Sequence, residues 1–202
     1  DVYKRQVLTA TEQRQALDYA RRAATEPVRD GGGTGSRGRW LPDLDDLRGA
    51  LRDPGACFVT LRTDGALQGC IGSLAAYRPL GVDVAANAAA AAFDDPRLPP
   101  LTPADVPVTE VHVSVLGTMR PMTAGDLGTL RAGLRPGVDG LVVEATNRRA
   151  TFLPSVWAQV ADVDEFLAAL WRKAGLPPRS WPHGITLHTY EVQEFSGPLA
   201  SP

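Results

Sequence analysis

One cysteine, Cys70, lies between Gly69 and Gly72 in the stretch ALQGCIGSL, directly after residues that alternate as a strand. Two chemistries fit this pattern. Glycines without side chains let a substrate approach the backbone closely, which would suit a reactive thiol. A cysteine at a crowded turn is also a small apolar filler. No histidine lies in the motif to act as a base, so the pattern leaves both interpretations open.

The second cysteine, Cys57, falls in the same predicted hairpin. Asp64-Gly65 is a typical two-residue turn, which places Cys70 opposite Val59. Cys57 would then lie one diagonal away on the same sheet face, at roughly 7–8 Å between Cα atoms. That separation exceeds the usual disulfide range, so we expect two free thiols.

Sites for metals and nucleotides are weakly supported. The three histidines, His112, His183 and His188, and the two cysteines show no metal-ligand spacing, so we expect no metal. The segment 33–38, GTGSRG, matches G-x-G-x-x-G, but a helix precedes it and none opens after it, which favours a flexible loop. We therefore expect no cofactor.

Composition narrows the class of protein. The 202 residues are 44% hydrophobic and 22% charged with a net charge of -2, which favours a globular protein without nucleic-acid or membrane partners. No apolar run approaches the roughly 20 residues of a membrane span. Two cysteines predict a reducing cytoplasm. The first six residues, DVYKRQ, read as a non-native leader, which leaves residues 7–202 as one domain.

The pattern of elements predicts an α+β fold with helices on one face of antiparallel sheet. Thr9 and Glu12 form a capping box that opens a helix ending at Pro27. Further elements follow from hydrophobic spacing and turn residues. We expect helices at 43–53, 78–95, 123–134 and 162–174, hairpins at 57–72 and 141–153, and strands at 108–117 and 184–195.

The alanine-rich helix carries three polar residues, Asp83, Asn87 and Asp94, which fall within about 40° of one another at 100° per residue. One interpretation is a closely packed core helix with a thin solvated stripe. The other is that Asn87 and Asp94 line a polar site.

Several motifs occur together in a recognisable order. They are the stretch from FVTLRTDGALQGCIGSL through FDDPRLPPL, the strand EVHVSVLG, and the later segments GVDGLVVEATNRRATFLPSVW and FLAALWRKAGLPPRSW. Over about residues 7–196 the chain resembles the AMMECR1 domain family, whose bacterial and archaeal members are called AmmeMemoRadiSam system protein A. The resemblance implies a two-lobed, layered α+β protein.

The resemblance also implies partners: a Memo-like protein, itself similar to extradiol dioxygenases, and a radical S-adenosylmethionine enzyme. It names no reaction. The family signature has an arginine where this chain has Gln68, so a role for that position as an anion clamp or thiolate-stabilising cation is lost. Arg97 or Lys173 could substitute. This chain cannot be the radical enzyme, because two cysteines cannot supply three thiolates for an iron–sulfur cluster.

Two functions remain as hypotheses. The chain is a binding or accessory component, or it is a thiol-dependent enzyme with Cys70 as the catalytic residue acting on a small-molecule or protein substrate. We expect any ligand to lie in a cleft between the two lobes, with Arg97 binding an anion. The ligand-binding residues would be Gly69, Gly72, Asn87, Asp94, Asp95, Arg97 and Ser114. The alternative is that Asp95-Pro96-Arg97 merely ends a helix and that Cys70 is a buried hydrophobe.

Overall fold

A computed structural model describes residues 7–29, 39–145 and 147–200 of the chain. The chain divides into two compact units. Among the described residues, the major unit contains those within 7–116 and 193–200, and the inserted unit contains those within 117–192. The proposed leader, residues 1–6, and the glycine-rich segment 33–38 lie outside the described residues.

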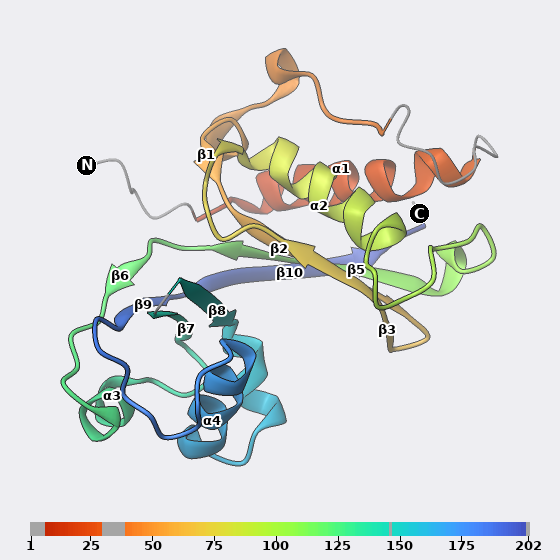
Figure 1. The fold of residues 1–202 in the computed structure, drawn as a ribbon. Coiled ribbons are helices and arrows are strands. Elements are labelled where there is room, and N and C mark those ends of the chain that lie inside the picture. Colours follow the sequence, from red (N-terminus) through yellow and green to blue (C-terminus); the bar gives the residue numbers. More distant parts are fainter. Residues whose placement is uncertain (1–6, 30–38, 146, 201–202) are drawn as a thin grey trace. The chain divides into compact units, whose positions relative to one another are not determined.

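The major unit is a four-stranded antiparallel sheet in the order β10-β5-β2-β3, covered on one face by two helices (Figure 1). Its core comes from alternate residues of the strands and from the small side chains of the helices. The elements are α1 (Ala10–Arg29), β2 (Cys57–Thr63), β3 (Ala66–Gly72), α2 (Leu80–Phe93), β5 (Thr109–Leu116) and β10 (Val192–Pro198), with a short pair of β1 (Pro54–Gly55) and β4 (Arg78–Pro79).

Alanine determines how closely α2 packs. Ala85, Ala88, Ala89, Ala91 and Ala92 are all at most 1% exposed, because the helix lies against both α1 and the sheet. Such short side chains bring backbone against backbone, which leaves no room for larger residues. The prediction of a buried, alanine-rich helix is confirmed.

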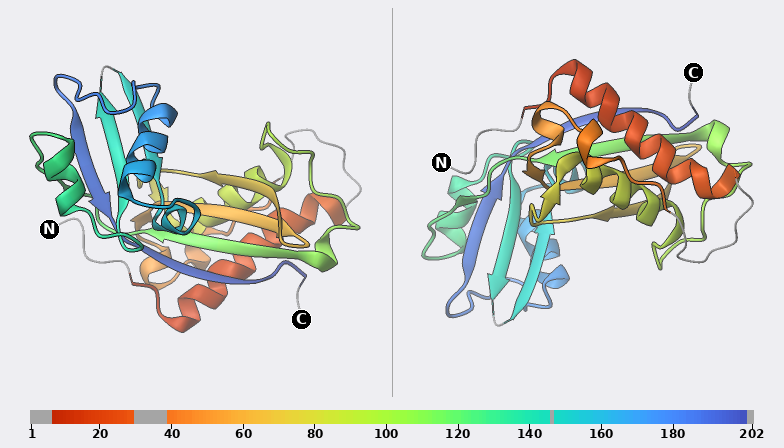
Figure 2. Two further views of the ribbon diagram at one scale, coloured as in Figure 1. Left: turned by 90° about the horizontal axis from the view of Figure 1, so that it is seen from below. Right: turned by 90° about the horizontal axis from the view of Figure 1, so that it is seen from above.

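The inserted unit has its own sheet, in the order β6-β9-β7-β8 (Figure 2). It also has its own hydrophobic core. Side chains of both its helices pack with those of the strands around Phe166 and Trp171. Its elements are β6 (Arg120–Pro121), α3 (Leu127–Gly133), β7 (Gly140–Ala145), β8 (Arg148–Phe152), α4 (Val163–Lys173) and β9 (Thr186–Tyr190).

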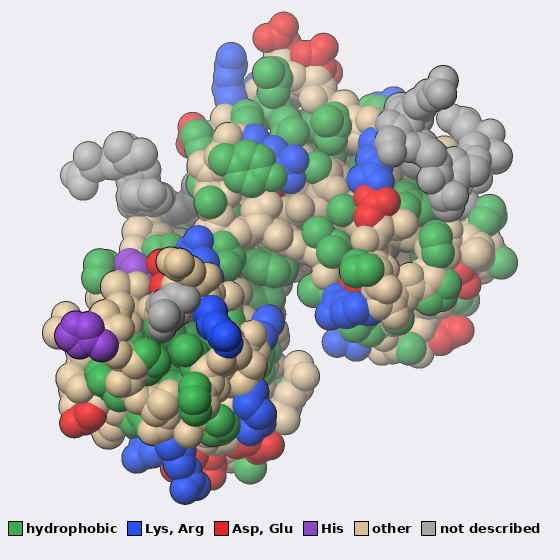
Figure 3. Space-filling view, in the orientation of Figure 1, with side chains coloured by type: hydrophobic (Ala, Val, Ile, Leu, Met, Phe, Trp, Pro, Cys, Tyr) green, Lys and Arg blue, Asp and Glu red, His purple; other side chains and the backbone are tan. Residues whose placement is uncertain are grey.

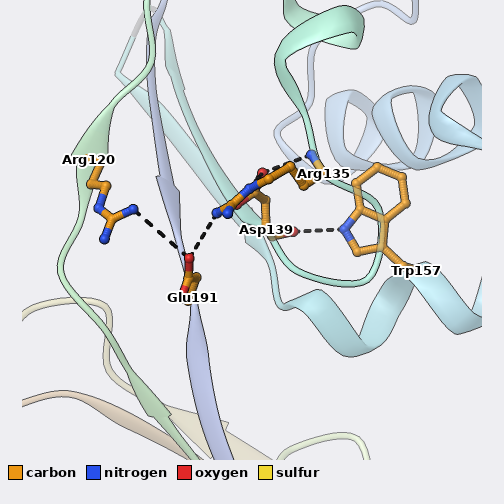
Figure 4. A network of polar contacts seen from close by, with 5 residues as sticks. All are labelled: Arg120, Arg135, Asp139, Trp157 and Glu191. Carbon is orange, nitrogen blue, oxygen red and sulfur yellow. Dashed lines mark hydrogen bonds and ion pairs between the residues drawn. The ribbon is translucent and has the colours of Figure 1, made fainter. Parts of the chain in front are cut away.

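A polar network ties the ends of the inserted unit together (Figure 4). Arg135 bonds the buried Asp139 through two nitrogens and reaches Glu191 at 2.9 Å, while Trp157 donates to the Asp139 carbonyl. Arg120 lies 4.0 Å from the same Glu191 carboxylate. Because Glu191 follows β9 directly, this network fixes the segment where the chain leaves the unit.

The α+β class, the antiparallel pairing and both predicted hairpins are confirmed. Asp64 and Gly65 have φ of 49° and 79°, as a tight hairpin turn requires. The capping box at Thr9 and Glu12 is also present, with each residue's backbone N–H bonded to the other's side chain.

Three element predictions were wrong in their bounds. The first helix continues past Pro27 to Arg29. The predicted helix at 43–53 is two short 3-10 turns, Leu44–Asp46 and Gly49–Leu51, because Gly49 has a φ of 55° and interrupts any helix there. The helix predicted at 123–134 begins only after its N-cap, Asp126.

The predicted last strand, 184–195, is two strands in two different sheets. β9 ends at Tyr190 in the inserted unit, and β10 begins at Val192 and belongs to the sheet of the major unit. The alternation of the sequence continues across Glu191, so periodicity alone does not reveal the change of sheet.

Candidate functional site

The site is built on β3, which lies at the edge of the major sheet. A strand at an edge exposes unpaired N–H and C=O groups. Here two side chains bind those of Cys70. The Cys70 N–H donates to Asp95 Oδ2 at 2.9 Å, and Arg97 Nη2 donates to the Cys70 carbonyl at 3.1 Å. We call Asp95 and Arg97 the edge clip.

The clip is held rigid by its own bonds. Arg97 donates to Asp95 from Nε at 2.8 Å and from Nη2 at 2.6 Å, the two-point geometry of a strong arginine–carboxylate pair. The Arg97 backbone N–H also bonds Asp95 Oδ1, which closes a tight turn around Pro96. The Asp-Pro-Arg turn therefore has two roles: it follows the end of α2, and it binds the exposed backbone groups at the edge of β3.

Burial and charge differ sharply across the clip. Asp95 is 5% exposed, and its hydrogen bonds with Arg97 hold the pKa of its carboxyl well below the usual range. The Arg97 side chain is 60% exposed, and the same pair raises its pKa. Its bonds to Asp95 and to the Cys70 carbonyl engage Nε and Nη2, so the exposed remainder of the guanidinium could bind an anion.

A one-residue bulge corrects the predicted register. Leu67 pairs with Arg62, but Gly69 already pairs with Leu61, so Gln68 is the extra residue in β3. Its side chain donates to the Pro99 carbonyl at 2.8 Å. One extra residue moves all later side chains of a strand to the other face.

Cys70 therefore faces Thr60 rather than Val59. The predicted placement of both cysteines on one sheet face was wrong: Cys57 points toward the helices and Cys70 points away from them. Both thiols are free, as expected.

The surroundings of the Cys70 thiol are polar and include a cation, because Arg97 interacts with the Cys70 side chain as well as with its carbonyl, and this interaction helps to raise the pKa of Arg97. Thr60 Oγ1 donates to Cys70 Sγ at 3.3 Å. His112 pairs with Thr60 from the other side, so Cys70, Thr60 and His112 form one row across three strands. Two strand spacings separate the ends of this row by about 9–10 Å. His112 is too far away to take a proton from Cys70 directly; its Nε2 lies 3.3 Å from Glu110 Oε2.

The two glycines serve packing rather than access. A Cβ at Gly69 would lie 1.9 Å from the Ala91 carbonyl oxygen of α2. A Cβ at Gly72 would lie 2.3 Å from the Phe58 ring. Each glycine thus permits a close contact inside the unit, which corrects the expectation that they open the backbone to a ligand.

Asn87 belongs to a different cluster, on the helix-facing side of the sheet. It donates to Asp83 Oδ2 at 3.0 Å and to the Cys57 carbonyl at 3.1 Å. Asp83 is completely buried and also accepts from Cys57 N, Ser73 and Arg78. Burial and the Asp83 charge raise the pKa of the Cys57 thiol. The polar stripe of α2 is thus buried at Asp83 and Asn87, and neither residue is part of the Cys70 site.

Two other expected members also lie away from Cys70, although Ser114 is on the same sheet face, two strands across. Asp94 pairs with Arg39, and Ser114 Oγ donates to Glu194 at 3.2 Å. Lys173, a candidate substitute for the family's arginine, donates to the Thr151 carbonyl in the inserted unit. Of the residues expected to converge, the structure brings together Cys70, Asp95 and Arg97, with Gly69 beside them. Sequence reasoning missed Thr60, which only the register reveals.

Neither a metal-binding cluster nor a membrane-spanning helix occurs in the described residues. Within 7–29, 39–145 and 147–200, no three His, Cys, Asp or Glu side chains gather as a metal site would require. In the same part of the chain, no helix combines the length and apolar character needed to cross a membrane. Figure 3 shows Lys and Arg interspersed with Asp and Glu on the face that it draws.

Comparison with known proteins agrees with these motifs. A protein of Methanothermobacter thermautotrophicus is 39% identical over 173 residues, covering 85% of this chain and 86% of its own. A Thermococcus gammatolerans protein is 35% identical over 192 residues, covering 89% and 90%. The crystal structure of an uncharacterized protein from Pyrococcus horikoshii superposes with a TM-score of 0.78 at 30% identity, over 90% of this chain and 89% of that one. Residues 17–195 match the AMMECR1 family, and the chain belongs to that family.

Proposed function

We propose that this protein is a binding or accessory component of a multi-protein system, acting with a Memo-like protein and a radical S-adenosylmethionine enzyme. The observation that carries the proposal is the edge clip. Both backbone polar groups of Cys70 are bound by Asp95 and Arg97, and the remainder of the Arg97 guanidinium is exposed. A rigid surface with one presented cation suits docking of an acidic group.

The surroundings of Cys70 support binding over catalysis. A cysteine nucleophile needs a base or a cation that stabilises its thiolate. The sulfur contacts the Thr60 hydroxyl, and the cation that interacts with it, Arg97, is already paired with Asp95 through two side-chain hydrogen bonds. The nearest histidine in its row lies two strands away.

Binding of this protein to a purified Memo-like protein and to a purified radical S-adenosylmethionine enzyme tests the proposal. We expect Arg97→Ala to weaken binding at least tenfold and Arg52→Ala, which removes an exposed arginine of the same unit, to change it less than twofold. Arg97→Ala leaves the buried Asp95 carboxylate unpaired, so the double variant D95N/R97A is the informative one. If that variant stays folded and binds as well as the wild type, or if neither partner binds the wild type, the proposal is wrong.

The thiol-dependent enzyme is the second candidate, and the Thr60–Cys70 hydrogen bond favours it. A hydroxyl that donates to sulfur stabilises a thiolate. If Cys70 is catalytic, it should react with iodoacetamide faster than a free thiol does at the same pH, and Thr60→Val should slow this reaction. If Cys70 reacts as slowly as the buried Cys57, the thiol has no catalytic role.

A further inference from the structure

The inserted unit has a surface hollow of about 200 Å³ between α3 and α4. Four of the residues that line it are apolar, Leu127, Leu167, Ala168 and Trp171, and the other four are charged, Arg131, Asp164, Glu165 and Arg179. An engineered apolar cavity of about 150 Å³ is large enough to hold benzene. The hollow therefore has room for one ring or one branched aliphatic group.

The charged side chains around this hollow differ in whether they have bonded partners. Arg131 of α3 pairs with Asp164 of α4. Glu165 accepts the Ala161 N–H at 2.7 Å as part of the capping box of α4. Arg179 is exposed, and no described residue bonds its guanidinium. Arg179 is thus the cation of the lining that has no bonded partner among the described residues, and its guanidinium is open to a ligand.

The backbone holds Arg179 in place at the hollow. The Ser180 N–H bonds the Pro177 carbonyl and closes a turn, with Pro178 second and Arg179 third. Arg179 has a φ of 66°, in the left-handed region where this turn position favours glycine. Trp171, which lines the hollow, also donates to the Ser180 carbonyl at 2.8 Å. The same tryptophan therefore lines the site and anchors the turn that carries its cation.

We propose that this hollow binds an apolar carboxylate, with the apolar group against Leu127 and Ala168 and the carboxylate on Arg179. A guanidinium binds a carboxylate through two parallel hydrogen bonds. The same chemistry exists in a free small acid and in the C-terminal residue of a protein chain. This site lies in the inserted unit and is independent of the edge clip, so either proposal can fail alone.

In the test, the full chain is titrated with 3-phenylpropanoate as the probe. Binding is measured from the NMR shifts of the backbone amides of α3, α4 and residues 177–180. Four variants separate the contributions. Arg179→Gly removes the cation and relieves the left-handed backbone, so it should not unfold the protein. Arg179→Lys keeps the charge, Ala168→Phe fills the hollow, and Arg172→Ala removes an exposed arginine that does not line it.

We expect saturable binding that Arg179→Gly and Ala168→Phe each weaken at least tenfold, Arg179→Lys weakens less, and Arg172→Ala changes less than twofold. The neutral amide, 3-phenylpropanamide, should bind at least tenfold more weakly. A peptide ending in a free Phe carboxylate that competes with the probe would identify a chain terminus as a ligand, and failure to compete would identify the free acid. Absence of saturable shifts up to 10 mM probe, or equal binding by Arg179→Gly, overturns the proposal.

Discussion

Asp95 is the residue on which the edge of β3 depends. Its buried carboxylate accepts hydrogen bonds from the Cys70 N–H and from the backbone and side chain of Arg97. The Asp-Pro-Arg motif was visible in the sequence, and its role as a helix stop was one of two interpretations. The bond to Cys70, 25 residues away, depends on how α2 packs on β3, and no local pattern reveals that.

Asp95→Asn should make stability less dependent on pH. The pKa of Asp95 is lower in the folded protein than the unfolded value near 3.9, so its ionised form stabilises the fold above about pH 4. That contribution disappears as pH falls below the unfolded pKa toward the folded one. We expect the variant to lose about 1.5–3 kcal/mol at pH 6, the usual range for hydrogen bonds to a charged group. Urea unfolding at pH 6 and pH 3 measures the difference, which should shrink at pH 3; an equal loss at both would contradict this account.

Gly69→Ala should destabilise the protein by about 1–3 kcal/mol, as overpacking in a core typically does. The new Cβ would meet the Ala91 backbone oxygen, which cannot turn aside as a side chain would. Gly125→Ala is the control, because a Cβ added there would meet no described atom within 4 Å, and it should stay within about 0.5 kcal/mol. Thermal unfolding compares the two. Similar melting temperatures would show that β3 can move away from α2.

At the scale of elements, α2 and β2 are joined by a buried polar cluster as well as by apolar packing. Asp83 accepts from Arg78 Nε at 2.8 Å and from the Cys57 N–H at 2.9 Å, while Asn87 lies one turn further along the helix. The sequence placed Asp83 and Asn87 on one stripe correctly. It could not show that these two residues are buried, since charged side chains normally lie on the solvent-exposed surface.

The register of β3 shows a second limit of local patterns. The turn at Asp64-Gly65 was predictable from its residues, and the first pairs after it follow the predicted register. The bulge at Gln68 arises where β3 meets α2, at the Gly69–Ala91 contact and beside the Gln68–Pro99 bond. Both are tertiary contacts. They decide which face Cys70 occupies, and hence which residues can belong to its site.

Asp83→Ala should be among the most damaging single changes in the major unit. It leaves the Arg78 guanidinium, the Asn87 amide and the Cys57 N–H without their acceptor, and breaking a buried ion pair typically costs about 3–5 kcal/mol. Asp94→Ala removes an exposed pair with Arg39 at the end of the same helix and should cost at most about 1 kcal/mol. Urea midpoints measure both. Equal losses would mean that the buried cluster contributes no more than the surface pair.

At the scale of the whole molecule, the order of the segments along the chain explains how the two units are formed. The inserted unit is one continuous segment with its own core, and the major unit is built from the residues on either side of it. The sequence showed no linker, because the chain passes from β5 directly to Gly117 and from Glu191 directly to β10. Continuous strand patterns therefore concealed both boundaries.

The ends of the inserted unit are adjacent, which predicts that it folds alone. The Gly117 N–H donates to the Glu191 carbonyl at 2.8 Å, and Arg120 and Arg135 fix the Glu191 carboxylate from within the unit. Inserted domains whose ends lie close together often fold independently. We expect a fragment of residues 117–192 to give dispersed NMR amide shifts and cooperative unfolding.

The reciprocal variant, which lacks the inserted unit, tests whether the major unit also folds alone. Replacing residues 118–190 by a short Gly-Ser linker leaves the core of the major unit, and with it the edge clip, intact. It should still protect the Cys57 thiol from alkylation, because that thiol is buried in the major core. The fragment should bind 3-phenylpropanoate and the linker variant should not, since every residue lining the hollow belongs to the inserted unit. If Cys57 of the linker variant is alkylated freely, or if the isolated fragment stays disordered, the two units depend on each other to fold.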